Sequence, residues 1–197
     1  MKLLEKQLWH LLALSVLIFV IVTLVNLDSQ IMAGSFWNIS TKTWFITAIL
    51  IPIVHQVYVL IMWRSELYYK TLSNLLGKYA FQIYKGIFFI FFIGRMVLLI
   101  FLAISNNNTF SLNSYLHYLI IIVVSLIAFY AFYSVIRYFG TSRAAGLDHF
   151  DVEARKLPLV KHGIFKYTSN SMYTYAFLAF YIPGLIYQSK AAILVTL

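Results

Sequence analysis

Four long apolar runs constrain this chain more than any other feature of its sequence. They cover about Leu8–Leu27, Thr43–Trp63, Tyr79–Ile104 and Tyr115–Phe139. Each is long enough to cross a hydrocarbon layer about 30 Å thick as a helix that rises about 1.5 Å per residue. The sequence lacks the succession of alternating strands, each about ten residues long, that a membrane barrel needs. We therefore predict an all-α fold, a polytopic bundle of transmembrane helices.

Two further apolar runs follow a polar stretch. The fifth run, Met172–Tyr187, is interrupted by Pro183-Gly184, and another begins at Ala191 and reaches Leu197 after seven residues. Seven residues are too few to cross a membrane. We expect one membrane domain over residues 1–197, with about five spans, a truncated sixth and a missing C-terminal closing segment.

The composition places the chain among membrane proteins. It is 62% hydrophobic and 11% charged, whereas a soluble domain is about half apolar and a quarter charged. The absence of cysteine excludes disulfides, thiol catalysis and cysteine-bound metals. The net charge of +9 lies mainly at the ends of apolar runs, a pattern typical of topology signals and contact with anionic lipid. We expect the bilayer and a lipid substrate as partners, no nucleic acid and no metal; the oligomeric state stays open.

The basic residues also predict an orientation. They are Lys2 and Lys6 before the first run, three in the loop after the second, and five in the loop after the fourth, whereas the two intervening loops hold only Lys42. Short cytoplasmic loops carry an excess of Lys and Arg. The N-terminus and residues 140–171 are therefore predicted to be cytoplasmic.

Two polar residues interrupt the apolar runs. His55 follows Pro52, which is expected to kink its helix, and we favour a packed histidine beside that kink over a substrate contact. Arg95 lies deeper in the third run and is costly unless paired or wetted. It is either part of a structural contact, to an acidic partner or a lipid phosphate, or a contact to the anionic headgroup of a substrate.

The polar stretch Arg137–Tyr175 contains all three acidic residues that follow Glu66, and polar residues beside a bilayer usually mark function. An imidazole group ordinarily titrates near neutral pH, so His149 or His162 could act as a general base, and for His162 we favour a hydrogen-bonded loop histidine. Asp148 beside His149 is a weak metal pattern. No serine lies in the setting of a hydrolase nucleophile.

One ordered set of residues gives this stretch a recognisable pattern. Arg137 and Gly140 end the fourth run, and they are followed at fixed spacing by Leu159, Val160, Gly163, Phe165, Asn170, Met172 and Tyr173. This pattern resembles the membrane methyltransferases that use S-adenosylmethionine, namely the phospholipid N-methyltransferases and isoprenylcysteine carboxyl methyltransferases.

The resemblance implies methyl transfer from S-adenosylmethionine to a lipid or lipid-like acceptor at the cytoplasmic face, an amine of the phosphatidylethanolamine type being the first choice. The implied cofactor-binding residues are Leu159, Val160, His162, Gly163, Phe165, Asn170, Met172 and Tyr173. The expected catalytic residues are His149 and Tyr173, and the expected substrate contacts are Arg95, Arg143, Asp148 and Arg155. Gly163 would let the backbone approach the cofactor.

Two departures from the family pattern are visible. Ser171 stands where the family has proline, and its hydroxyl could cap the following helix. The Arg and Glu residues that close the family's cofactor site would lie beyond Leu197. The alternatives are an NADPH-dependent membrane reductase of the sterol type, which has a similar closing segment, and a non-catalytic transporter or channel fragment.

Overall fold

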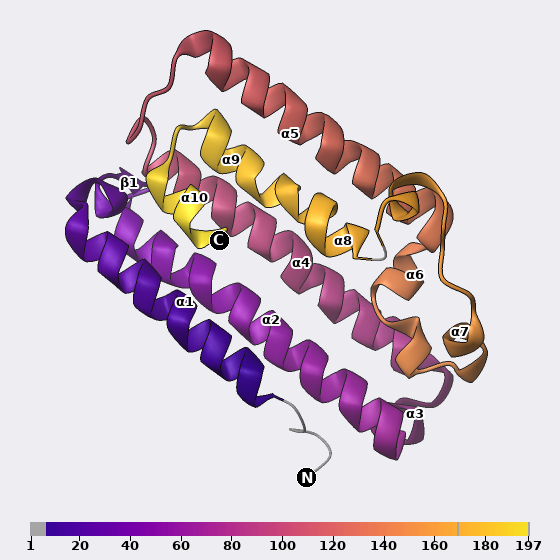
Figure 1. Ribbon diagram of the computed structural model, residues 1–197. Coiled ribbons are helices and arrows are strands. Elements are labelled where there is room, and N and C mark those ends of the chain that lie inside the picture. Colours follow the sequence, from indigo (N-terminus) through magenta and orange to yellow (C-terminus); the bar gives the residue numbers. More distant parts are fainter. Residues whose placement is uncertain (1–6, 169, 197) are drawn as a thin grey trace.

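The computed structural model describes residues 7–168 and 170–196, and it is all-α apart from one short hairpin. Over these residues, four helical segments are long and apolar enough to cross a membrane. They are α1 (Leu8–Leu27), α2 (Thr41–Tyr69), α4 (Ala80–Ser105) with the preceding α3 (Thr71–Leu76), and α5 (Ser114–Ser134) with a π-helical turn at Val135–Phe139. Their long axes run roughly parallel (Figure 1). The predicted polytopic helical bundle is thus present as four candidate spans.

The fifth predicted run forms a shorter apolar helix, Ser171–Ile186, that lies between α4 and α5 (Figure 1). It consists of α8 (Ser171–Tyr175), a 3₁₀ segment (Ala176–Phe180) and α9 (Tyr181–Ile186). It falls short of the roughly 20 residues that a straight crossing needs. After it comes α10 (Lys190–Val195). A fifth and a sixth span therefore remain predictions.

The two ends of the bundle differ in character. One end holds α3 and the polar stretch, and the other holds the hairpin of β1 (Ser35–Phe36) and β2 (Ile39–Ser40) (Figure 1). Lys2 and Lys6 lie outside the described residues. The predicted cytoplasmic side therefore stays a prediction.

Side chains outside the apolar runs fix where the helices begin. Ser40 Oγ accepts the Thr43 N–H at 3.3 Å at the start of α2. Fully buried Glu66 near the end of α2 accepts the N–H groups of Leu72 and Ser73 at 2.9 and 3.1 Å. A carboxylate at a helix start satisfies backbone donors that the helix itself leaves free. Glu66 therefore joins α2 to α3 across Lys70, and helix replaces the linker expected at residues 64–78.

The largest buried cluster joins α2, α4 and the C-terminal helices through small residues. Ala48 of α2, Ala103 of α4, and Ala191 and Ala192 of α10 are all buried, and Phe180 packs among them. Small side chains allow helix backbones to approach closely, and that contact drives packing in lipid, where apolar burial contributes little.

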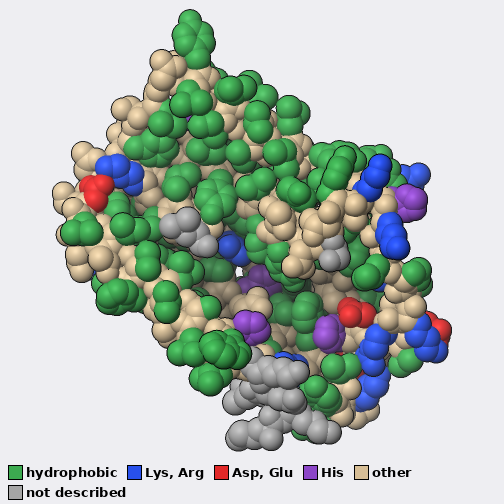
Figure 2. Space-filling view, in the orientation of Figure 1, with side chains coloured by type: hydrophobic (Ala, Val, Ile, Leu, Met, Phe, Trp, Pro, Cys, Tyr) green, Lys and Arg blue, Asp and Glu red, His purple; other side chains and the backbone are tan. Residues whose placement is uncertain are grey.

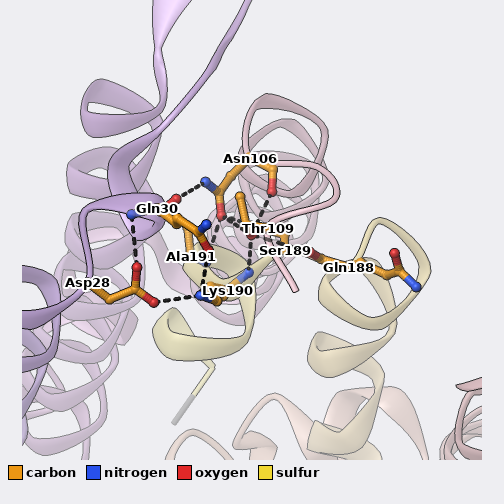
Figure 3. Close-up of polar contacts among 8 residues, drawn as sticks. All are labelled: Asp28, Gln30, Asn106, Thr109, Gln188, Ser189, Lys190 and Ala191. Atoms are coloured by element: carbon orange, nitrogen blue, oxygen red, sulfur yellow. Dashed lines mark hydrogen bonds and ion pairs between the residues drawn. The ribbon is translucent and has the colours of Figure 1, made fainter. Parts of the chain in front are cut away.

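A polar hub at the hairpin end ties the C-terminal segment to this cluster (Figure 3). The side chain of Asn106, which is 1% exposed, donates to the carbonyls of Gln30 and Ala33 at 2.8 and 2.9 Å. Its Oδ1 accepts the Ser189 hydroxyl at 3.1 Å and the Ala191 N–H at 2.9 Å. One carboxamide thereby holds together three segments that are far apart in the sequence.

An ion pair lies beside this hub. Lys190 Nζ donates to Asp28 Oδ2 at 2.6 Å and to Gln30 Oε1 at 2.7 Å (Figure 3). The hydrogen bond from Lys190, together with the Gln30 N–H, holds the pKa of Asp28 below its usual value. The start of α10 is thus fixed against the end of α1.

Replacing Asn106 by alanine tests the hub. Asn106→Ala leaves buried carbonyl and N–H groups without partners, each costing about 1–3 kcal/mol. We expect a clearly lower thermal-unfolding midpoint in detergent, corresponding to about 2–4 kcal/mol. The matched control is Asn107→Ala, which removes two exposed hydrogen bonds, one donated to the Ile104 carbonyl and one accepted from the Asn108 side chain. Equal midpoints for the two variants would contradict the role of the hub.

Candidate functional site

The polar stretch begins where α5 changes to a π-helical turn. The Gly140 N–H donates to the Val135 carbonyl at 2.7 Å, which closes the π-helical turn. Gly140 has φ +88°, a conformation that glycine adopts without strain, and it ends the helix. π-Helical turns occur frequently at functional sites. The short helices α6 (Thr141–Ala144) and α7 (Val152–Lys156) follow, separated by a 3₁₀ turn at Leu147–His149.

Basic side chains hold this loop in shape. Arg143 Nη2 donates to the carbonyls of Leu157 and Pro158 at 3.1 and 3.0 Å. Arg155 Nε donates to the Asp148 carbonyl at 2.9 Å. The structure thus places the predicted substrate contacts Arg143 and Arg155 in intraloop bonds. A further bond, from Lys85 Nζ of α4 to Ser142 Oγ at 2.9 Å, ties the loop to the bundle.

Gly163 brings the second half of the motif against α5. Its φ is +59°, and a Cβ on this residue would lie 2.5 Å from Ser134 Oγ and 2.8 Å from the Tyr138 ring. The next residue, Ile164, donates its N–H to the same Ser134 hydroxyl at 3.1 Å. In this structure the close backbone approach expected of Gly163 is made to a helix.

Ser171 reinforces this contact instead of capping its helix. Its hydroxyl is fully buried and donates to the carbonyl of Ile164 at 2.8 Å and to that of Thr168. Within the described residues, no side chain caps α8 at Asn170. The predicted capping role is therefore wrong, because the hydroxyl points back to the Gly163 turn.

Motif residues form a second packed cluster. Val160, Phe165 and Met172 pack with Ile164 and with Val135 of the π-helical turn. The Phe165 ring also stacks on Phe139, with centroids 5.2 Å apart. The two separated halves of the motif thus form a single unit at the loop end of the bundle.

A cavity of about 300 Å³ lies next to this unit, between α2, α4, α5 and the Ser171–Ile186 helix. Its volume is at the lower end of the range for small-molecule sites. The wall is mostly aliphatic and aromatic, and its polar members come from α2, α4, α6 and the Ser171–Ile186 helix: His55, Gln56, Trp63, Arg95, Thr141 and Tyr173. Figure 2 shows basic and histidine side chains inside a recess of an otherwise largely hydrophobic face.

His149 lies behind this wall. Its ring stacks on Trp63 with centroids 4.4 Å apart and an interplanar angle of 10°. Its Nδ1 is buried and has no hydrogen-bond partner within residues 7–168 and 170–196. Burial lowers the pKa of His149 below its usual value, the nearby Asp148 carboxylate opposes this shift, and Arg155 adds to it.

The structure brings together only some of the predicted site residues. Arg95, Met172 and Tyr173 line the cavity. Val160 and Phe165 pack behind it. The remaining predicted cofactor contacts lie away from the wall: Gly163 is seated on α5, and Leu159, His162 and Asn170 are exposed, Leu159 by 71%. Asp148 and His149 belong to the loop beside Trp63.

Some residues that line the cavity were not predicted from the sequence as site residues. Gln56 and Thr141 were not singled out, and His55 was interpreted as a packed residue, yet all three line the cavity. The available signal was two adjacent polar residues, His55 and Gln56, in the middle of an apolar run. Intramembrane polar residues usually face the bundle interior or a cavity.

No protein-family model, curated protein or solved structure matches this chain.

The lowered pKa of His149 predicts loss of stability in mild acid. The unfolded chain takes up a proton as the pH falls through about 6.5, whereas the buried imidazole resists protonation. The stabilising contribution is therefore complete above that pH and declines below it, down to the folded-state pKa. His149→Phe keeps a ring against Trp63. It should reduce the slope with which the thermal-unfolding midpoint falls between pH 7 and pH 5. His162→Gln, at an exposed histidine, should leave the wild-type slope unchanged; an unchanged slope in His149→Phe would refute this assignment.

Adding a methyl group at Gly163 should weaken the contact to α5. Gly163→Ala introduces positive-φ strain and a clash with Ser134, so we expect destabilisation of about 1–3 kcal/mol. The control is Gly86→Ala, where an added Cβ meets nothing within 4 Å. Thermal unfolding in detergent compares the two variants. If the midpoint of Gly163→Ala equals that of the control, the Gly163 backbone does not pack as closely against Ser134 and Tyr138 as described.

Proposed function

We propose that this chain is a membrane methyltransferase that moves a methyl group from S-adenosylmethionine to a lipid or lipid-like acceptor. One observation supports this most: the second half of the motif and the residues that directly follow its first half border one cavity. Thr141 and Ala144 follow Gly140, and Met172 and Tyr173 end the second half; these four residues line the same wall as the membrane-embedded Arg95. This cavity extends from the polar loop at Thr141 to Arg95 on α4. Such an arrangement suits a soluble donor at the loop end and a lipid acceptor at the Arg95 end.

The chemistry of the wall fits the proposed cofactor. Its aromatic side chains suit an adenine ring and a cationic sulfonium, and they are Trp63, Phe88, Phe89, Phe92, Phe132, Tyr173 and Phe177. Gln56 and Thr141 offer hydrogen bonds to a ribose, and Arg95 suits a carboxylate or phosphate. When bound, S-adenosylmethionine supplies an activated methyl group.

The residues of this chain would contribute mainly alignment and exclusion of water. Methyl transfer is an in-line displacement. Holding the methyl group of the donor in line with the attacking atom of the acceptor therefore supplies much of the rate enhancement. Met172 and Tyr173 would hold the cofactor at the loop end. Of the two proposed catalytic residues, Tyr173 lines the cavity, whereas His149 is separated from it by the Trp63 ring. A role for His149 as base would require the acceptor to approach the loop side of Trp63.

The orientation belongs to the same proposal. Placing residues 140–171 on the cytoplasmic side gives the loop end of the cavity access to soluble cofactors. Phosphatidylethanolamine remains the first acceptor to test. The alternatives are an NADPH-dependent membrane reductase and a non-catalytic transporter or channel fragment, and cofactor binding separates these three.

Calorimetry on the purified full-length protein in nanodiscs tests the proposal. We expect S-adenosylhomocysteine to bind and NADPH not to compete. Tyr173→Ala should weaken binding several-fold, because an aromatic contact contributes about 0.5–1.5 kcal/mol. The matched control is Tyr167→Ala, at a tyrosine that is 70% exposed and does not line the cavity. Absence of binding would sink the methyltransferase assignment, and binding of NADPH alone would favour the reductase.

A further inference from the structure

Arg95 lies near the middle of the membrane-spanning part of the fold. Because α4 runs from Ala80 to Ser105, Arg95 is roughly 15 Å from the Ser105 end and roughly 22 Å from the Ala80 end at about 1.5 Å per residue. A cation at such depth is costly unless something compensates its charge. The structure therefore raises the question of what neutralises Arg95.

Among the described residues, Arg95 has aromatic rings against it but no counter-charge. The guanidinium lies 4.1 Å from the ring centroid of Phe180 and 5.6 Å from that of Phe177. Such contacts cover the face of the guanidinium and leave its N–H edge available. Within residues 7–168 and 170–196, Arg95 makes no ion pair or hydrogen bond. The predicted alternative of a structural pair with an acidic residue thus has no support in the described chain.

Two further polar side chains lack partners on the same wall. His55 Nε2 is buried without a hydrogen-bond partner among the described residues. The neighbouring Gln56 is exposed on α2 but also lines the cavity, and its amide makes no hydrogen bond within that part of the chain. A buried polar atom such as His55 Nε2 is normally hydrogen-bonded in proteins. Three helix-borne groups, one charged, thus face one hollow with their bonding capacity unused.

We propose that Arg95, His55 and Gln56 form an anion site at mid-membrane depth, which holds the carboxylate or phosphate of an anionic amphiphile. The aromatic wall would cover the first part of its hydrocarbon chain. The Arg95 guanidinium and the Gln56 amide donate hydrogen bonds to the anion, and His55 adds a third through its Nε2–H tautomer. This deepens the proposed function by stating how a lipid acceptor is held, yet lipid binding is measurable without any methyl donor.

The same chemistry could come from a soluble source, the carboxylate of the methyl donor. The two sources differ in what else they carry, since an amphiphile brings a long hydrocarbon chain and the cofactor does not. Oleate and oleyl alcohol share one chain and differ in charge, so they isolate the anion. S-adenosylhomocysteine carries the cofactor's carboxylate with no lipid chain. These three probes distinguish the sources.

Native mass spectrometry of the full-length protein in a non-ionic detergent provides the test. Wild-type protein should bind oleate at least about tenfold more tightly than oleyl alcohol, because a hydrogen-bonded charge is worth that much or more. Arg95→Gln should abolish this preference, and Arg95→Lys should retain most of it. The wild-type comparison needs no variant, so it stays decisive even if Arg95→Gln folds poorly.

A matched control excludes attraction by any cation near the bilayer. Lys42 lines a separate apolar groove between α1 and α2, and Lys42→Gln should keep the oleate preference. Equal wild-type binding of the two probes, or a preference lost equally in Lys42→Gln, would overturn the proposal. It is also overturned if Arg95→Gln weakens only S-adenosylhomocysteine. Oleate selectivity without S-adenosylhomocysteine binding would sink the methyltransferase and leave the anion site standing.

Discussion

The carboxamide of Asn106 fixes the position of the C-terminal helix α10. It joins the end of α4 to the start of α10 and to the turn after α1. Between helices in lipid there is little hydrophobic driving force, so polar contacts and close packing decide where a short helix settles. Without this hub, α10 would be held by the Lys190–Asp28 ion pair and by packing of small residues.

A second set of polar contacts secures the start of the apolar helix that precedes α10. Ser134 accepts the N–H of Ile164, and Ser171 donates to the Ile164 carbonyl. The Ser171–Ile186 helix is therefore fixed at both ends, while its middle runs along α4 and α5. The cavity opens beside the first half of this helix, at Met172, Tyr173, Ala176 and Phe177. Its shape follows from where the two anchors hold the helix, and the anchors themselves lie outside the cavity.

The sequence predicted the parts of this fold that depend on local hydropathy. The four long spans were expected because any run of that length and polarity is stable in lipid only as a helix. The extension of α2 past Trp63 was missed, because it depends on buried Glu66 contacting a helix six residues later. The candidate site divides in the same way. Met172, Tyr173 and Arg95 line one cavity. The contacts of Gly163 and Ser171 depend on which segment lies opposite them, and spacing alone does not reveal that.

The charge of the cavity limits which chemistry the proposed function can use. Its described wall includes the guanidinium of Arg95 and no carboxylate. In a low-dielectric hollow, a cation repels a second cation much more strongly than in water. A protonated amine acceptor would therefore be disfavoured near Arg95, and it would have to be neutral there or stay at the loop end. A phosphate or carboxylate on the same lipid is attracted to that depth. An acceptor of the phosphatidylethanolamine type thus fits this cavity best with its phosphate toward Arg95 and its amine toward Tyr173, where the donor's methyl group would be held.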